Sequence, residues 1–147
     1  MKKALFAGSF DPFTRGHQSI VDRTLAIADE VVVAIGRNAN NHTMLTLEQR
    51  IEAIEQLYAD EPRVKVMSYD GLTTDFAASV GATFLVRGVR NIADFEFERN
   101  IADVNRKLTG IETVLLVTES EYSHISSSIV RELMSYGRDV SDFMPQK

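Results

Sequence analysis

The stretch from Gly8 to His17 contains the residue types from which proteins build a phosphate site. It follows the apolar run 4–7 and precedes an apolar-periodic segment, so a buried strand is expected to lead through a turn into a helix. The start of a helix offers unpaired N–H groups and a positive dipole end, which both attract phosphate. Thr14 adds a hydroxyl at that point. Because the sequence has neither a Walker A motif nor G-x-G-x-x-G, this pattern predicts a nucleotide site of another kind.

His17 is the residue of this stretch best suited to contact a reacting phosphate. Because the positive end of the helix disfavours a second charge, we expect its imidazole to stay neutral and to donate one hydrogen bond to a phosphoryl oxygen. Gly8 is expected to permit the sharp turn. The alternative is an ordinary loop that ends in a helix cap and a surface histidine. The order of strand, glycine turn and helix start favours the phosphate site.

Two further segments combine anion-binding groups with a strand end or a helix start. The sequence Arg-Gly-Val-Arg at 87–90 follows the apolar run 83–86, and two arginines at a strand end suit bidentate binding of phosphate. The three serines at 126–128 are expected to open the last helix with hydroxyls and free amides, where an anion also binds well. Solvated arginines and a serine-rich cap are the alternatives.

The segment 94–108 has two different stripes at helical spacing. One stripe is apolar and is expected to face the core. It consists of Phe97, Ile101, Val104 and Leu108. The other contains Glu98, Ala102 and Asn105, where a small residue between two polar ones leaves room for a ligand. The alternative for this second stripe is an ordinary solvated face.

The remaining pattern alternates β-rich apolar runs with helical periodicity. Strands are expected at 3–7, 31–35, 64–67, 83–86 and 113–117, and helices at 16–28, from the capping box 46–49, at 73–80, 94–108, 126–136 and 141–144. This order predicts an α/β fold: a Rossmann-like, doubly wound, five-stranded parallel sheet with helices on both faces. Ligands of such sheets bind at the carboxyl ends of the strands, where the candidate segments fall.

Length and composition narrow the class of protein. The 147 residues predict one domain, 1–147, and their net charge of −5 argues against a large nucleic-acid-binding face. Without cysteine there is no disulfide, thiolate metal site or cysteine nucleophile, and the three histidines are too scattered to predict a metal cage. No segment reaches transmembrane length. We expect a cytoplasmic protein with neither a nucleic-acid nor a membrane partner.

Several motifs in one order carry a family resemblance. They are Gly8-Ser9-Phe10-Asp11-Pro12 with Thr14-x-Gly16-His17, Arg87-Gly88-x-Arg90, Asp94-Phe95-Glu96-Phe97-Glu98, Asn105-Arg106 and Ile125-Ser126-Ser127-Ser128. Together they closely resemble the bacterial phosphopantetheine adenylyltransferases, over nearly the whole chain. The first and last motifs mark only the wider nucleotidylyltransferase superfamily. The motif at 87–90 and the acidic-aromatic run after it point to this member.

The resemblance implies a reaction and its partners. ATP and 4′-phosphopantetheine would give dephospho-coenzyme A and pyrophosphate, with Mg²⁺ accompanying ATP. Coenzyme A would be a feedback ligand, and six chains would assemble as two trimers. A related enzyme with nicotinate mononucleotide or a phosphorylated alcohol as acceptor is one alternative. A nucleotide-binding sensor without catalysis is another, although it would have no need of His17.

The resemblance also implies roles for individual residues. Catalysis would involve Ser9, His17 and Arg90, with Ser9 orienting the attacking phosphate and His17 stabilising the transition state. ATP would contact Ser9, Phe10, His17, Gly88, Val89, Arg90, Glu98, Tyr122, Ser123, His124, Ile125, Ser126, Ser127 and Ser128. Phosphopantetheine would contact Ser9, Asn41, Thr73, Arg87 and Asn105.

One position departs from the family pattern. Where these enzymes carry a lysine pair near the substrate phosphate, this chain has Asn41 and His42. Asn41 would make a weaker neutral contact, His42 would supply partial charge, or Arg37 would compensate. A loop that simply varies is equally compatible with the sequence.

Overall fold

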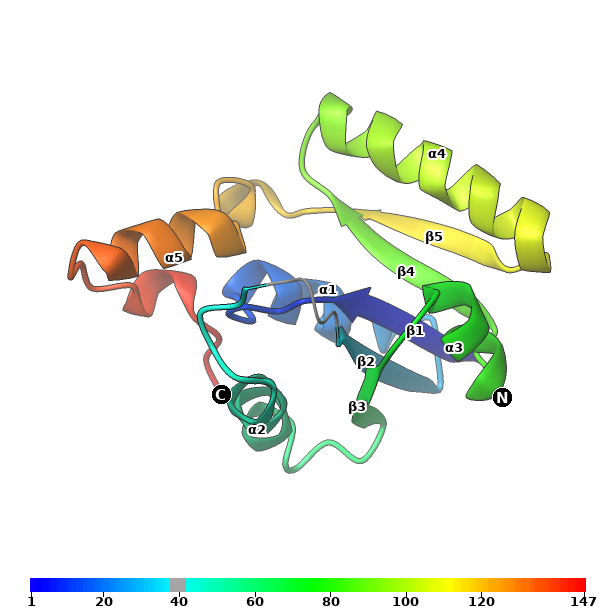
Figure 1. The fold of residues 1–147 in the computed structure, drawn as a ribbon, viewed down its shortest axis with the longest axis horizontal. Helices are drawn as coiled ribbons and strands as arrows, with labels where there is room; N and C mark the ends of the chain where they lie inside the picture. The colour runs from blue at the N-terminus through cyan, green and yellow to red at the C-terminus, as the bar shows by residue number, and fades with distance from the viewer. Residues whose placement is uncertain (38–41) are drawn as a thin grey trace.

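The structure is a computed structural model that describes residues 1–37 and 42–147. Five parallel strands form one sheet in the order β3-β2-β1-β4-β5 (Figure 1). The strands are β1 (Lys3–Gly8), β2 (Glu30–Gly36), β3 (Val64–Tyr69), β4 (Phe84–Val89) and β5 (Glu112–Val117). The helices are α1 (Arg15–Thr24), α2 (Leu47–Leu57), α3 (Thr73–Ser79), α4 (Ile92–Thr109) and α5 (Ser127–Ser135), with short 3₁₀ turns at Ser120–Tyr122 and Ser141–Phe143.

Successive side chains of the central strands point to opposite faces of the sheet, and both sets are apolar. Each face is therefore covered by helices and has its own core. Phe6 of β1 packs with Ile20 of α1 and Ile54 of α2 on one face. Leu5 points to the other face, where it packs with Ala77 of α3. The predicted α/β architecture is confirmed.

The switch point of this sheet lies at β1. That strand pairs with β2 along one edge and with β4 along the other, so the connections leaving β1 and β4 diverge at their carboxyl ends. Open α/β sheets bind ligands in the crevice that such a divergence leaves. Two of the segments expected to bind phosphate, 8–17 and 87–90, therefore meet at one place.

Two element boundaries differ from the predicted ones by more than two residues. The first helix ends at Thr24 rather than at 28, where the Thr24 hydroxyl donates to the Ile20 carbonyl at 2.6 Å and the chain continues as turns. The fourth strand continues through Arg87 and Gly88, which were expected in a loop. A Cβ at Gly88 would lie 3.0 Å from the Ile20 side chain, so glycine lets α1 pack closely on this strand.

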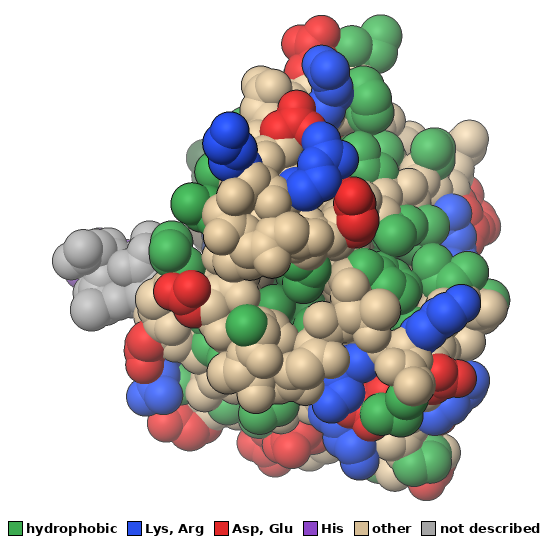
Figure 2. All heavy atoms as spheres, turned by 90° about the vertical axis from the view of Figure 1, so that its right-hand side faces the viewer, with side chains coloured by type: hydrophobic (Ala, Val, Ile, Leu, Met, Phe, Trp, Pro, Cys, Tyr) green, Lys and Arg blue, Asp and Glu red, His purple; other side chains and the backbone are tan. Residues whose placement is uncertain are grey.

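The apolar stripe of α4 does not face the core, which corrects the sequence prediction. Phe97, Val104 and Leu108 are 63%, 56% and 59% exposed, and Ile101 is also exposed. The side turned toward the sheet is instead the polar one, with Asp94 and Asn105 partly covered and Glu98 buried. Viewed toward the C-terminal end of α4, hydrophobic side chains lie beside charged ones at the top of the molecule (Figure 2).

In the described ranges 1–37 and 42–147, no helix combines the length and apolarity needed to span a membrane.

Candidate active site

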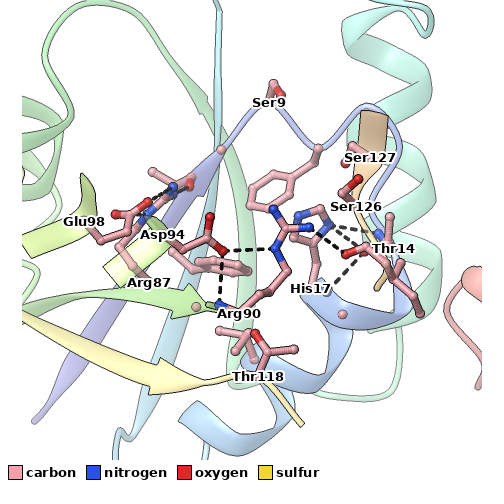
Figure 3. Close-up of a pocket in the computed structure, with 18 residues that line it drawn as sticks. Ser9, Thr14, His17, Arg87, Arg90, Asp94, Glu98, Thr118, Ser126 and Ser127 are labelled. Carbon is pink, nitrogen blue, oxygen red and sulfur yellow. Dashed lines mark hydrogen bonds and ion pairs between the residues drawn. The ribbon is translucent and has the colours of Figure 1, made fainter. Parts of the chain in front are cut away.

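A cavity of about 300 Å³ opens at the carboxyl ends of β1 and β4. Its walls come from the turn after β1, the start of α1, the end of β4, the start of α4 and the start of α5 (Figure 3). The lining residues are Phe6, Ala7, Gly8, Ser9, Phe10, Thr14, Gly16, His17, Ile20, Arg87, Gly88, Arg90, Asp94, Glu98, Thr118, Ile125, Ser126 and Ser127. Three segments chosen from the sequence therefore surround one space.

His17 is held in one orientation at the start of α1. The backbone N–H of Thr14 donates to His17 Nδ1 at 2.9 Å, and the Thr14 hydroxyl accepts from the His17 backbone N–H at 3.4 Å (Figure 3). Because Nδ1 accepts a hydrogen bond, the neutral ring carries its proton on Nε2. The cavity wall thus offers a fixed N–H donor at the position where the sequence predicts a phosphate.

The surroundings of His17 keep it uncharged. Its ring lies 5.0 to 6.1 Å, between centroids, from the rings of Phe6, Phe10 and Phe13. Burial among them, with smaller effects from the Arg87 and Arg90 charges, lowers the pKa of His17 to about 3. The predicted neutrality is confirmed, but its main cause is burial rather than the helix end.

The turn after β1, where the sequence predicts a phosphate, is held through its carbonyl oxygens by side chains of α2 and α5. Arg50 of α2, which is 6% exposed, donates from Nη1 to the Ser9 carbonyl at 2.8 Å. Arg131 and Ser127 of α5 donate to the carbonyls of residues 11 and 12, each at 2.8 Å. The left-handed residue of the turn is Phe10, with φ of 49°, and not Gly8 as the glycine suggested. Such a φ is costly for a residue with a side chain, so these contacts stabilise a strained conformation.

The contact from Arg50 has a consequence for the cavity. In a trans peptide the C=O and the following N–H point in opposite directions. Because Arg50 holds the Ser9 carbonyl on the α2 side, the N–H of Phe10 is directed toward the cavity that both residues line. A backbone N–H in this position is a donor for an anion.

Arg87 and Glu98 form a bidentate ion pair at one side of the cavity. Arg87 Nε and Nη2 each lie 2.9 Å from a Glu98 oxygen, and Nη1 donates to the Ala7 carbonyl (Figure 3). The Glu98 side chain is 8% exposed and that of Arg87 is 37% exposed. The guanidinium is thereby fixed in place while one side of it stays open to a ligand.

A second cavity of about 230 Å³ lies next to the first at this ion pair. Ala7, Gly8, Arg87 and Glu98 line both cavities. The second one continues between the sheet and α4, where its other lining residues are Leu5, Tyr69, Thr73, Leu85, Val86, Ile101, Ala102, Asn105 and Thr113. Thr73, Arg87 and Asn105, expected to bind one substrate, thus line one space. The stripe of Glu98, Ala102 and Asn105 faces this cavity rather than solvent.

Known proteins resemble this chain over its full length. A family model described as cytidylyltransferase-like matches residues 5–133. The phosphopantetheine adenylyltransferase of Bacteroides thetaiotaomicron is 56% identical over 146 residues, covering 99% of this chain and 97% of that protein. The enzyme of the same name from Porphyromonas gingivalis is 58% identical over 148 residues, covering likewise 99% and 97%. The chain belongs to the phosphopantetheine adenylyltransferase family. This membership confirms the prediction made from the motifs.

Solved structures with the same fold are more distant in sequence. A bifunctional NMN adenylyltransferase/ADP ribose pyrophosphatase from Francisella tularensis, complexed with AMP and a Mn ion, has a TM-score of 0.73 at 15% identity, covering 97% of this chain and 44% of that one. A putative nicotinate-nucleotide adenylyltransferase from Vibrio parahaemolyticus has a TM-score of 0.63 at 19% identity, covering 99% and 95%. At these identities the likeness shows the fold alone.

Some residues that the phosphopantetheine adenylyltransferase motifs pointed to do not line the first cavity. The residues that do not line it are Val89, Tyr122, Ser123, His124 and Ser128. Their neighbours Ile125, Ser126 and Ser127 do line it. Tyr122 lies under the Arg15 guanidinium, 5.6 Å from ring centroid to Arg15 Cζ. The Ser128 hydroxyl accepts from Arg131 at 3.2 Å. Their contact with ATP stays a prediction.

The family's lysine pair near the substrate phosphate has no evident replacement among the described residues of this loop. Asn41 lies outside them. His42 is exposed and Arg37 pairs with Asp70 at 3.6 Å, and neither lines either cavity. The choice among Asn41, His42 and Arg37 therefore stays open.

Sequence reasoning gave no contact at this site to several polar residues that the structure places there, among them Arg50, Asp94, Thr118 and Arg131. Asp94 accepts from Arg90 Nε at 3.1 Å, and its spacing of four residues from Arg90 was a readable signal (Figure 3). Arg50 had no such signal, because it lies 41 residues from the carbonyl that it holds.

Replacing Arg50 by Met is expected to raise the KM for ATP about ten- to hundredfold, the effect of losing a hydrogen bond from a charged group. The change keeps the aliphatic stem and frees the Ser9 carbonyl, so the N–H of Phe10 loses its fixed direction. Steady-state kinetics with each substrate varied would measure the effect. Arg99→Met, on the exposed side of α4, is the control. An unchanged KM for ATP in a folded R50M protein would show that Arg50 has no part in nucleotide binding.

Proposed function

We propose that this chain transfers the adenylyl group of ATP to 4′-phosphopantetheine, releasing pyrophosphate and dephospho-coenzyme A. The observation that supports this most is that the two cavities meet at Gly8 and Arg87, with Ser9 and His17 lining the first. A transfer between two phosphorylated substrates needs such a junction, because the attacking phosphate and the α-phosphate must meet in line. We assign ATP to the first cavity and the pantetheine arm to the second.

The chemistry requires little beyond positioning and charge neutralisation. A phosphate monoester has its second pKa near about 6, so it is largely a dianion at neutral pH and needs no general base. Ser9 would orient this nucleophile, with Arg87 neutralising it. His17 Nε2–H, the Phe10 N–H and Arg90 would stabilise the charge that develops on the α-phosphoryl group. None of these groups has to gain or lose a proton.

Mg²⁺ would come with ATP rather than from a site on the protein. Within the described ranges no three acidic or histidine side chains are placed to hold a metal. The two carboxylates that line the first cavity, those of Asp94 and Glu98, are both engaged with arginines. Mg²⁺ keeps several waters and binds readily to substrate phosphates, which fits this arrangement.

The direct test is incubation with Mg·ATP and one acceptor at a time. We expect pyrophosphate release with 4′-phosphopantetheine, and none with nicotinate mononucleotide or glycerol 3-phosphate. Release only with one of the other acceptors would assign a different acceptor to the second cavity. Nucleotide binding without release for any acceptor would favour the sensor.

Coenzyme A is the proposed feedback ligand, because it contains both an adenine nucleotide and a pantetheine arm and so fits across the two neighbouring cavities. The cytoplasmic location expected from the sequence stays a prediction.

We propose that the outward stripe of α4 is an interface between copies of this chain, which would assemble as a hexamer of two trimers. Its apolar side chains Phe97, Val104 and Leu108 are more than half exposed, and Val117 at the end of β5 is 70% exposed. Exposed apolar side chains gathered on one helix face are typical of a surface that meets another protein. Charges of both signs flank the stripe, as in the Arg106–Asp103 and Arg106–Glu112 pairs, which suits a surface that meets its own copy.

Replacing Val104 by Glu is expected to reduce the particle size. The side chain is 56% exposed within one chain, so the change costs little in the fold but places an unpaired charge in the interface. Light scattering after size exclusion would give the mass, with Arg99→Glu as a control that alters charge off the stripe. If V104E and the wild type have the same oligomeric mass, the interface lies elsewhere.

A further inference from the structure

A third cavity, of about 420 Å³, lies between the turn after β1, helix α2 and the C-terminal residues Met144, Pro145 and Lys147. Among the described residues, Phe10 alone lines both this cavity and the first one, and none lines both this cavity and the second. Its volume is in the range of pockets that bind small molecules. The cavity is therefore a candidate site separate from those proposed for ATP and 4′-phosphopantetheine.

The wall formed by the C-terminal residues is fastened to α1. The side-chain amide of Gln18 donates from its nitrogen to the Gln146 carbonyl at 2.6 Å, and its oxygen accepts from the Gln146 backbone N–H at 3.1 Å. These two hydrogen bonds hold the segment 144–147 beside α2 (Figure 1). The cavity is thus enclosed by a segment that the fold keeps in place.

Arg50 brings a positive charge to this cavity that no acidic side chain neutralises. The residue is 6% exposed, and none of the ion pairs among the described residues includes it. Its guanidinium donates to two carbonyl oxygens, that of Ser9 at 2.8 Å and that of Thr46 at 3.4 Å. The carboxylate of the turn, Asp11, accepts instead from the N–H groups of residues 44 and 45, each at 2.8 Å. Buried charges are ordinarily paired, because neutral groups compensate a full charge only in part.

The guanidinium of Arg50 still has a donor available to a ligand. Nε and Nη1 make the two carbonyl contacts, and Nη2 has no partner within the ranges 1–37 and 42–147. In those ranges the one side-chain nitrogen or oxygen of a covered residue that is both closed to solvent and unpaired is Thr113 Oγ1, so Nη2 is not closed. Because Arg50 lines the third cavity, Nη2 is accessible from that space.

The composition of the wall indicates the class of ligand. The charged residues that line the cavity, Arg50 and Lys147, are both positive, and no Asp or Glu occurs among its described lining residues, although the chain has a net charge of −5. Most of the remaining wall is apolar, with Phe13, Leu57 and Met144 among its larger side chains. A guanidinium binds a carboxylate strongly, and an apolar wall favours a hydrocarbon chain. The wall therefore matches an anion that joins the two.

We propose that the third cavity binds a carboxylate with an apolar chain, with the carboxylate at Arg50 and the chain between α2 and the C-terminal residues. The site is separate from the interface proposed above, because α2 and the C-terminus lie well away from α4 (Figure 1). The guanidinium that holds the Ser9 carbonyl also contacts this ligand. The ligand therefore touches the support of the turn without entering the cavity assigned to ATP.

Titration calorimetry with octanoate, 1-octanol and acetate tests the proposal. Octanoate has both the charge and the chain, so we expect the wild-type protein to bind one equivalent of it per chain. Octanol lacks the charge and should bind at least about tenfold more weakly, the effect of losing a hydrogen bond between charged groups. Acetate lacks the chain and should also bind at least about tenfold more weakly. The proposal is overturned if octanoate does not bind, or if octanol or acetate binds as tightly.

Ala53→Glu locates the site. Ala53 is exposed on α2 and lines the cavity, so the change costs little in the fold, and the added negative charge should weaken octanoate binding at least about tenfold. Ala78→Glu makes the same change at an exposed position of α3 and should leave the Kd within twofold of wild type. Arg50 is kept in both variants because it also holds the turn, so pyrophosphate release should be that of the wild type.

An equal Kd for octanoate in A53E and the wild type would place the acid elsewhere and overturn the proposal. An equal loss in A53E and A78E would overturn it too, because the effect would then come from net charge. Should A53E not fold, Lys147→Glu gives the same comparison at an exposed residue of the opposite wall. These measurements follow binding alone, so their outcome is independent of the acceptor that the enzyme uses.

Discussion

His17→Ala is expected to lower kcat about 100- to 1000-fold, the usual cost of removing one preorganised donor to a developing charge. The donor is preorganised here because the Thr14 N–H occupies Nδ1 and leaves the proton on Nε2. Rapid-quench or steady-state measurement of pyrophosphate release gives kcat. Nucleotide affinity should change much less, because several other donors line the same cavity. A kcat within tenfold of wild type, with full nucleotide affinity, would contradict the role given to His17.

The pH dependence of activity and stability gives an independent check on His17. With a folded pKa of about 3, His17 is neutral throughout the range where the enzyme would work, so kcat between pH 6 and 8 should show no titration of this residue. The free energy of unfolding, in contrast, should depend on the titration of His17. Between pH 6.5 and about 3 the unfolded chain binds a proton at His17 that the folded chain does not, so the free energy of unfolding falls as pH falls through this window. His17→Gln should lose less stability than the wild type on going from pH 7 to pH 5 in urea unfolding.

Arg87→Ala is expected to lower kcat/KM for phosphopantetheine about 100-fold or more, in the range measured when one partner of a hydrogen-bonded charge pair is truncated. The loss has two sources. The substrate phosphate loses its guanidinium, and the nearly buried Glu98 carboxylate loses the partner that holds it at 2.9 Å through two hydrogen bonds. Steady-state kinetics would measure the first effect and thermal unfolding the second.

Two companion variants separate these sources. Arg87→Ala combined with Glu98→Gln removes the unpaired buried charge, so it should regain thermal stability while substrate affinity stays low. Arg87→Lys keeps one positive charge but lacks the bidentate geometry, so it should lie between the wild type and the alanine variant. Full recovery of kcat/KM in the double variant would show that Arg87 acts on Glu98 alone and does not contact the substrate.

Much of the site could be predicted because its parts are local in sequence. The turn after β1, the arginines at the end of β4 and the serines at the start of α5 each combine a strand end or helix start with groups that bind anions. Their convergence follows from the parallel sheet, since carboxyl ends of neighbouring strands meet at one edge. The residues that hold the turn from behind could not be predicted in this way. Arg50 and Arg131 contact carbonyls 41 and 120 residues away. Every residue has a backbone carbonyl, so the sequence does not indicate which one an arginine will contact.

Helix α4 shows most clearly which features the sequence determines and which only the tertiary structure decides. The sequence by itself determined that this segment is a helix with one apolar and one polar stripe, because periodicity is a local property. It also determined the alternation of strands and helices and the motifs that are expected to bind phosphate. Only the tertiary structure decided that the polar stripe with Glu98 faces inward over the second cavity and that the apolar stripe faces outward. The physical reason is that burial stabilises an apolar stripe equally against its own sheet or against another chain, so amphipathicity alone does not say which surface it meets.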